Sequence, residues 1–290
     1  MKGIVLAGGT GTRLWPATRS VNKQLLTIYD KPMIYYPIST LMMAGIREMA
    51  IITTPSSREN FREQLGNGSQ WGIELTFLTQ DEPKGIAQAL LVAEKYLGNE
   101  SSLLILGDNI FYGTGIGIGL NKTFPEIGAH IFTYEVSEPW HYGVLTLNDD
   151  GEPVGIAEKP KNSKSKLAIT GLYYFDNTAQ SRVKELNPSL RGELEITDLL
   201  QLFLMEKLLT FTKLSRGSAW LDTGNPKSLN DAGNFIRIIE ERTGLKISCP
   251  EEISWRQGWI SDAQLKELSQ IFLGNQYGTY LEKLLETNKL

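Results

Sequence analysis

The chain has 290 residues, of which 41% are hydrophobic and 21% charged, and its net charge at pH 7 is −4. These are the proportions of an ordinary globular protein, and the acidic balance argues against nucleic acid as the main partner. A single cysteine, Cys249, excludes an internal disulfide, and two histidines are too few for a histidine-rich metal site.

No stretch approaches the ~18 consecutive apolar residues of a membrane span. The first predicted strand begins almost at once, without a separate apolar leader and cleavage site. We therefore expect a cytoplasmic protein without a membrane partner.

The stretch that follows the first predicted strand, residues 4–7, predicts a phosphate-binding loop. Its glycines tolerate positive φ and let a ligand approach bare N–H groups, and a nearby arginine and lysine add positive charge. Leu14 stands where the dinucleotide pattern needs its third glycine, and the P-loop string is absent. A strand-to-helix turn without a ligand is the alternative. The residues concerned are Gly8, Gly9, Gly11, Thr12, Arg13 and, ten residues on, Lys23.

The first half of the chain alternates strand and helix signals. This order predicts an α/β fold with a mostly parallel central sheet and helices on both faces. Ligands of such sheets lie beyond the carboxyl ends of the strands, which is where the glycine loop and Asp108 both fall. The predicted strands are 4–7, 49–53, 73–78 and 102–106, and the predicted helical segments are 33–44, 57–65 and 86–97.

From about residue 129 the pattern changes to short strands separated by turns, with Asp150-Gly151 as a hairpin turn. We expect one core over residues 1–244, whose second half contains a smaller antiparallel part, and a helical appendage over 245–290. The predicted strands are 131–136, 144–147, 154–158, 172–175, 209–214 and 219–221, and the predicted helices are 197–207, 227–241, 261–268 and 279–285.

Two aspartates, Asp108 and Asp222, each follow a predicted strand. Mg²⁺ commonly uses one or two carboxylates together with substrate phosphates, so the pair is a candidate metal site; a turn or a helix cap is the alternative for each. Glu158 and Lys159 end another strand, either as a solvated charge pair or as a polar recognition pair. Trp220, beside Asp222, is on residue chemistry alone a core residue.

Several motifs occur together along nearly the whole chain. They resemble those of the sugar-1-phosphate nucleotidyltransferases and, within that family, are most similar to those of the glucose-1-phosphate thymidylyltransferases. The motifs are residues 6–16 with Lys23, Leu106-Gly107-Asp108, Glu158-Lys159-Pro160 and Trp220-Leu221-Asp222-Thr223-Gly224, and for the narrower resemblance residues 22–26, 31–37 and 192–198.

This resemblance implies a Rossmann-like nucleotidyltransferase fold, with the nucleotide bound by the first half of the core and the sugar phosphate by the second. It implies Mg²⁺-dependent transfer of a thymidylyl group from dTTP to glucose-1-phosphate, giving dTDP-glucose for dTDP-sugar biosynthesis, for example of dTDP-rhamnose. Arg13 and Lys23 would be the catalytic residues, and Asp108 and Asp222 would hold Mg²⁺.

The resemblance also implies two sets of binding residues. The nucleotide set is Leu6, Gly8, Gly9, Gly11, Thr12, Arg13, Gln24, Gln80, Pro83 and Gly85. The sugar-phosphate set is Lys23, Gly143, Glu158, Lys159, Ile169, Tyr173, Arg191 and Trp220. A homotetramer with a regulatory site is typical of the family, and the residues that match that site are Tyr112, Gly113, Arg216 and Arg256.

Three alternatives stay open from the sequence. A uridylyltransferase or another sugar nucleotidyltransferase would share the same motifs. A non-catalytic sensor of nucleotide sugars would not need both aspartates. An NAD-dependent oxidoreductase is disfavoured by Leu14 at the third glycine position.

Overall fold

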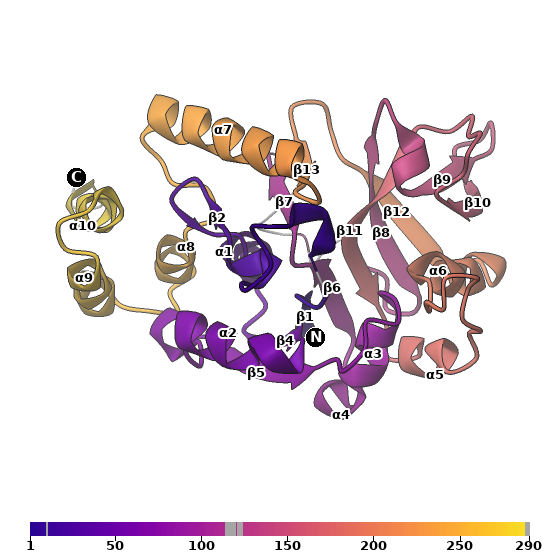
Figure 1. Cartoon of the computed structure of the whole chain (residues 1–290), viewed down its shortest axis with the longest axis horizontal. Coiled ribbons are helices and arrows are strands. Elements are labelled where there is room, and N and C mark those ends of the chain that lie inside the picture. The colour runs from indigo at the N-terminus through magenta and orange to yellow at the C-terminus, as the bar shows by residue number, and fades with distance from the viewer. Residues whose placement is uncertain (10, 114–119, 121–123, 288–290) are drawn as a thin grey trace.

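The computed structural model describes residues 1–9, 11–113, 120 and 124–287, so Thr10 of the glycine loop lies outside the described residues. Within this part of the chain, one nine-stranded sheet has the order β10-β9-β11-β6-β1-β4-β5, and β8 pairs with both β11 and β12 (Figure 1). The strands are β1 (Lys2–Leu6), β4 (Glu48–Thr53), β5 (Glu74–Thr79), β6 (Ser102–Leu106), β8 (Ala129–Glu135), β9 (Gly143–Leu147), β10 (Pro153–Glu158), β11 (Leu167–Phe175) and β12 (Leu209–Lys213).

The half of the sheet built from β6, β1, β4 and β5 is parallel. Successive side chains of a strand point to opposite faces, and here both faces are apolar. Val5 and Ile51 pack into the core on one face, whereas Ile4 and Ile52 pack into the core on the other. This explains the continuous apolar runs in the sequence, which are typical of parallel strands covered on both sides.

The second half of the sheet is largely antiparallel, and it continues directly from the first because β11 pairs antiparallel with β6. β9 and β10 form the predicted hairpin, in which the Gly151 N–H donates to Asn148 O at 3.1 Å. The predicted α/β fold is confirmed, and the antiparallel part belongs to the same sheet as the parallel part.

Helices cover both faces of the sheet. Those on one face are α1 (Tyr35–Met43) and α2 (Arg58–Leu65); those on the other are α3 (Gln88–Val92), α4 (Glu94–Leu97), α5 (Ala179–Val183) and α6 (Ile196–Met205). The helix predicted over residues 86–97 is two short helices that meet at Ala93, whose φ of −87° and ψ of 1° are not helical.

Two small sheets lie outside the main sheet. One pairs β2 (Thr27–Ile28) with β3 (Lys31–Pro32), and the other pairs β7 (Asn109–Tyr112) with β13 (Ala219–Asp222). The sequence predicted β13 but neither its partner β7 nor the β2–β3 pair. These segments are too short to show a clear alternation of apolar and polar residues.

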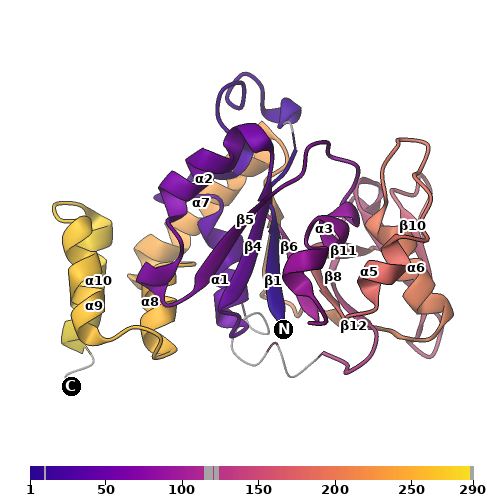
Figure 2. The same ribbon diagram turned by 90° about the horizontal axis from the view of Figure 1, so that it is seen from below.

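The C-terminal part consists of α8 (Pro250–Arg256), α9 (Asp262–Ile271) and α10 (Gln276–Thr287), which follow the long α7 (Pro226–Thr243). Figure 2 shows them at one end of the molecule, far from β10. They share a small apolar core around Leu265 and Leu281, and Trp71 of the core donates its indole N–H to Glu251 of α8 at 3.0 Å. The division at residue 244 stays a prediction, and α8 was not predicted.

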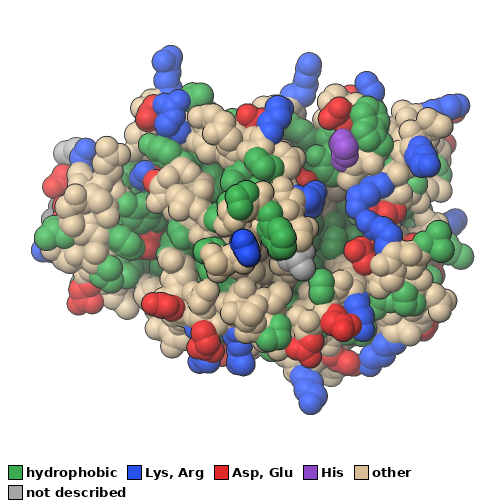
Figure 3. Space-filling view, in the orientation of Figure 1, with side chains coloured by type: hydrophobic (Ala, Val, Ile, Leu, Met, Phe, Trp, Pro, Cys, Tyr) green, Lys and Arg blue, Asp and Glu red, His purple; other side chains and the backbone are tan. Residues whose placement is uncertain are grey.

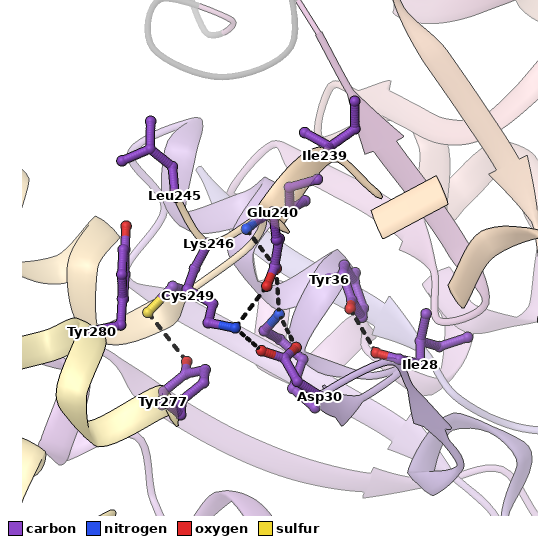
Figure 4. Close-up of polar contacts among 12 residues, drawn as sticks. Ile28, Asp30, Tyr36, Ile239, Glu240, Leu245, Lys246, Cys249, Tyr277 and Tyr280 are labelled. Atoms are coloured by element: carbon purple, nitrogen blue, oxygen red, sulfur yellow. Dashed lines mark hydrogen bonds and ion pairs between the residues drawn. The ribbon is translucent and has the colours of Figure 1, made fainter. Parts of the chain in front are cut away.

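A cluster of four charged side chains, Asp30, Lys31, Glu240 and Lys246, joins two segments that are far apart in the sequence. Figure 4 shows Asp30, Glu240 and Lys246 turned toward one another. Each lysine contacts both carboxylates; Lys31 Nζ lies 2.5 Å from Asp30 Oδ1 and 3.1 Å from Glu240 Oε1, and Lys246 Nζ contacts Asp30 Oδ2 and lies 2.7 Å from Glu240 Oε2. Because Lys31 and Glu240 are almost fully buried, their charges depend on this mutual pairing.

None of the helices formed by the described residues is long and apolar enough to cross a membrane.

Replacing Lys246 by Met is expected to lower the free energy of unfolding by about 3 kcal/mol, because breaking a buried ion pair leaves an uncompensated charge. Urea denaturation at pH 7 measures this. Lys227→Met is the matched control, since Lys227 pairs with Asp231 on the exposed surface of α7 and should change stability little. Equal effects of the two substitutions would contradict the cluster's role.

A second prediction concerns His130 of β8, which is 3% exposed and lies between the hydroxyls of Thr210 and Thr212, at 2.8 and 3.0 Å. Burial lowers the pKa of His130 to about 4. In the unfolded chain His130 binds a proton as the pH falls below about 6.5, whereas in the folded chain it stays neutral until about pH 4. The resulting stability is present above pH 6.5 and is lost as the pH falls toward 4, by up to about 1.4 kcal/mol per pH unit.

We expect the difference in unfolding free energy between the wild type and His130→Gln to shrink steadily from pH 7 to pH 4. Urea denaturation of both proteins at a series of pH values measures it. A difference that stays constant over this range would show that His130 is not held neutral.

Candidate active site

The parallel pairing of β1 with β6 brings the glycine loop next to Asp108. The register places Leu6 beside Leu106, so both chains leave the sheet at the same edge. The Gly107 N–H donates to Leu6 O at 2.9 Å. Gly9 and Gly11 have φ values of 120° and 60°, in agreement with the predicted need for glycine in this loop.

A one-turn helix, Lys23–Leu25, supplies the predicted lysine. The side chain of Asn22 caps it by accepting the Gln24 N–H at 2.9 Å, and its amide donates to Ala7 O at 3.2 Å. This side chain therefore ties the helix to the end of β1. Lys23 is 7% exposed, and its Nζ lies 2.5 Å from Asp108 Oδ2.

The β7–β13 pair brings the second aspartate to the same place. Asp222 is opposite Asn109 in the register, next in sequence to Asp108. Burial and then the negative charge of Asp108 raise the pKa of Asp222 to about 6, against the opposing charges of Lys23 and Arg13. The two carboxylates, 114 residues apart in sequence (222 − 108), are thus electrostatic neighbours.

Two cavities open beside this group. The first, of about 330 Å³, is formed by the glycine loop; it is lined by Gly8, Gly9, Gly11, Thr12, Arg13, Lys23, Gln24, Pro83, Asp108, Glu193 and Gly224. Eight of these were predicted for the nucleotide or for catalysis, namely all but Asp108, Glu193 and Gly224.

The second cavity, of about 200 Å³, lies toward the antiparallel strands and shares Arg13 and Asp108 with the first. Of the predicted sugar-phosphate residues, those that line it are Gly143, Glu158, Lys159, Ile169, Tyr173 and Trp220, and Asp222 lies on its wall. In the space-filling view the surface is hollowed between the part that carries α7 and the part that carries β9 and β10, with Lys and Arg side chains beside the hollow (Figure 3).

Three predicted nucleotide residues lie next to the first cavity rather than on its wall. A Cβ on Gly8 would lie 2.7 Å from Gln80 Oε1, and the Gln80 amide donates to Gln88 Oε1 at 2.6 Å. Gly85 packs so closely on the next segment that a Cβ there would lie 2.3 Å from Leu194 O. Leu6 ends β1 directly before the loop.

Comparison with known proteins identifies the family. Residues 2–238 match the model of the nucleotidyl transferase family. The chain is 48% identical over 287 residues to the glucose-1-phosphate thymidylyltransferase of Neisseria meningitidis, covering 99% of this chain and all of the relative. It is 50% identical over 286 residues to that of Mycolicibacterium smegmatis, covering 99% of each. The chain belongs to the nucleotidyl transferase family, among its glucose-1-phosphate thymidylyltransferases.

Solved structures agree with this assignment. A Bacillus anthracis protein described as a glucose-1-phosphate thymidylyltransferase, solved with sucrose, is 40% identical with a TM-score of 0.76, covering 82% of this chain and 95% of the other. A UDP-glucose pyrophosphorylase solved with UDP-glucose is 26% identical with a TM-score of 0.71, covering 82% of this chain and 98% of the other.

Enzymes of this family act on a nucleoside triphosphate and a sugar-1-phosphate and generally use a divalent metal. Among the described residues, no group of three or more His, Cys, Asp or Glu side chains is arranged to hold a metal. The pair Asp108 and Asp222 does fit one, because two carboxylate oxygen donors that repel each other suit a hard divalent cation.

Arg191 lies beside the second cavity but not on its wall. Its guanidinium contacts three carboxylates, with Nη2 at 2.8 Å from Glu195 Oε1, 3.4 Å from Glu193 Oε2 and 3.5 Å from Glu158 Oε1. It therefore reaches the second cavity through Glu158, and its predicted contact with the sugar phosphate stays a prediction.

The four residues predicted for regulation do not form one group. Tyr112 and Gly113 lie beside the segment that contains Arg216, because Tyr112 pairs with Ala219 and a Cβ on Gly113 would lie 2.7 Å from Ser218 Cα. Arg256 is on α8, where its Nε donates to Glu252 at 2.7 Å. A shared regulatory role stays a prediction.

Sequence reasoning missed several residues that line the cavities: Ile86, Leu106, Asn109, His141, Tyr142, Gly171, Ile196 and Thr197 in the second, and Glu193 and Gly224 in the first. A usable signal existed for Asn109, which directly follows Asp108, and for those residues that fall within the quoted motifs, namely Leu106, Glu193, Ile196, Thr197 and Gly224. In the sequence, Tyr142 and Gly171 look like residues at the start of plain strands.

Proposed function

We propose that this chain transfers a thymidylyl group from dTTP to glucose-1-phosphate, giving dTDP-glucose and pyrophosphate. The observation that carries the proposal is the pair of adjoining cavities that share Arg13 and Asp108. The glycine-loop cavity suits the triphosphate, and the second cavity suits a sugar phosphate. The reacting phosphates then meet where both cavities contact the same cation and carboxylate.

The relatives support dTTP as the nucleotide. Those named glucose-1-phosphate thymidylyltransferase match at 48–50% identity over almost the whole chain, whereas the UDP-glucose pyrophosphorylase matches at 26%. A uridylyltransferase is the second candidate, because that enzyme shares the fold with a TM-score of 0.71. The Gln80 amide beside Gly8 is the proposed reader of the base, together with the backbone at Gly85.

The transfer needs no dedicated general base. The second pKa of a phosphate monoester is about 6, so the sugar phosphate already carries a nucleophilic dianion at neutral pH. One of its oxygens attacks the α-phosphorus of dTTP, a new P–O bond forms, and pyrophosphate leaves with the electron pair of the broken bond. Such a reaction depends mainly on positioning and charge stabilisation.

Arg13 and Lys23 provide that stabilisation. Arg13 belongs to both cavities and can present a planar fork to phosphate oxygens. Lys23 is held almost buried between the loop and Asp108, so its ammonium is already in place when charge develops. Mg²⁺, held by Asp108 and Asp222, would add positive charge at the reacting phosphates.

The sugar ring would be held in the second cavity by Glu158. Its Oε2 lies 3.4 Å from the Thr197 hydroxyl and its Oε1 3.1 Å from Lys159 Nζ. A carboxylate fixed in this way can accept hydrogen bonds from two sugar hydroxyls, while Lys159 remains near the sugar phosphate. Tyr173 and Ile169 form the apolar side of the same wall.

The product would enter dTDP-sugar biosynthesis, for example that of dTDP-rhamnose. We also propose a homotetramer whose activity is regulated through the surface around Tyr112, Gly113 and Arg216.

The direct test is pyrophosphate release from each nucleoside triphosphate, with glucose-1-phosphate or galactose-1-phosphate, with and without Mg²⁺. We expect the highest kcat/KM with dTTP and glucose-1-phosphate, and no release without a divalent metal. A preference for UTP would favour the uridylyltransferase. Absence of release in every combination would favour a non-catalytic sensor.

Lys23→Ala and Asp108→Asn are each expected to lower kcat by at least about 100-fold, because each removes a charge at the reacting phosphates. Steady-state kinetics measures this, and the circular dichroism spectrum should stay unchanged. The control is Lys227→Ala on the exposed face of α7, which should keep full activity. Near-normal turnover in either site variant would remove that residue from the catalytic group.

A further inference from the structure

The carboxylate of Asp108 is held from both sides. Lys23 Nζ contacts its Oδ2 at 2.5 Å, and the side-chain amide of Asn109 donates to its Oδ1 at 2.9 Å. Asn109 is 2% exposed, so little of its side chain is open to water. The direction of the Asp108 carboxylate therefore depends on which end of the Asn109 amide faces it.

Trp220 decides that direction. Its indole N–H, a group that can only donate, lies 2.5 Å from Asn109 Oδ1. Oδ1 must therefore face Trp220, and the NH₂ group must face Asp108. With the opposite orientation, two oxygens would face each other at Asp108 and two donors would face each other at Trp220.

The fold builds this arrangement from three strands. The β7–β13 register places Asp222 opposite Asn109 and Trp220 opposite Phe111, so Trp220 lies two residues along β13 from the position opposite Asn109. On the other side, Gly171 of β11 leaves room for the amide, because a Cβ there would lie 2.7 Å from Asn109 Oδ1. The Asn109 amide therefore fits in the space beside Gly171, and its two hydrogen bonds fix its orientation.

We propose that Asn109 and Trp220 are positioning residues that orient the Asp108 carboxylate for the divalent metal. Trp220 acts through the hydrogen bond from its indole N–H to Asn109. The indole ring also lines the second cavity, and that is a separate role. The assignment rests on the proposed function, because it concerns the same carboxylate. It goes further because it gives the indole N–H of Trp220 a role in orienting Asp108 that is distinct from the role of the ring in lining the cavity.

Trp220→Phe tests the two roles separately, because phenylalanine keeps an aromatic ring in the cavity and removes the N–H donor to Asn109. The Asn109 oxygen then loses the donor that fixes it, so the NH₂ group is held less firmly against Asp108 and the carboxylate is less firmly oriented. We expect kcat to fall about 10-fold, the Mn²⁺ dissociation constant to rise several-fold, and the KM for glucose-1-phosphate to change less than about 2-fold. Mn²⁺ alone, followed by the electron paramagnetic resonance signal of the free ion, measures metal affinity without turnover.

Trp255→Phe is the matched control. Trp255 on α8 also donates its indole N–H to a side chain, Asp262 Oδ1, at 2.8 Å, but in the C-terminal part of the chain. Its replacement should leave kcat and Mn²⁺ affinity unchanged, which separates the loss of any indole bond from the loss of this one.

A double-mutant cycle tests whether Trp220 acts through Asn109. If it does, Trp220→Phe combined with Asn109→Ala is no worse in kcat or Mn²⁺ affinity than Asn109→Ala alone. If the fold-changes of the two single variants multiply in the double variant, the two residues act independently, and this result would overturn the proposal. So would unchanged kcat and Mn²⁺ affinity in Trp220→Phe, or an effect confined to KM, which would leave Trp220 only a wall of the cavity.

Failure of the proposed function has a different signature. In that case the wild type releases no pyrophosphate with any nucleotide, while the Mn²⁺ affinities of the wild type, the two single variants and the double variant still decide whether the pair orients Asp108.

Discussion

The parallel pairing of β1 with β6 is the constraint on which the whole site depends. It ends both strands at one edge, so that the glycine loop and Asp108 leave the sheet side by side. Lys23 is then fixed between them by the Asn22 cap, which also binds Ala7 O. Parallel strands require long crossover connections, and here those crossovers supply α1 and α2 on one face of the sheet and α3 and α4 on the other.

The site and the four-charge cluster treat buried charge in different ways. In the cluster, two lysines and two carboxylates from two segments far apart in the sequence pair with one another, and the charges balance. At the site, burial and the charge of Asp108 raise the pKa of Asp222 to about 6 although Lys23 and Arg13 oppose the shift. In the cluster the mutual pairing stabilises the fold, whereas at the site the pKa of a carboxylate is strongly perturbed, and such perturbed pKa values gather at functional sites.

Much of the candidate site could be predicted because its residues stand at strand ends in recognisable motifs, as Gly8, Arg13, Asp108 and Asp222 do. What could not be predicted depends on contacts across the sheet. Gly171 looks like an ordinary strand residue until β11 packs against Asn109, and the contact of Arg191 with Glu158 joins residues far apart in the sequence. The helix predicted over residues 86–97 is interrupted at Ala93. The apolar pattern of this segment is continuous, so the interruption could not be predicted from it.

The sequence by itself determined the α/β class, the mostly parallel first half, the glycine loop and the family, because periodicity and local motifs are properties of neighbouring residues. Only the tertiary structure decided that Asp108 and Asp222 meet, that two cavities share Arg13, and that Trp220 fixes the Asn109 amide. Each of these depends on the register between strands far apart in the chain, chiefly β1 with β6 and β7 with β13. A shift of one residue would turn those side chains to the other face of the strand, and neither pairing is readable from either strand alone.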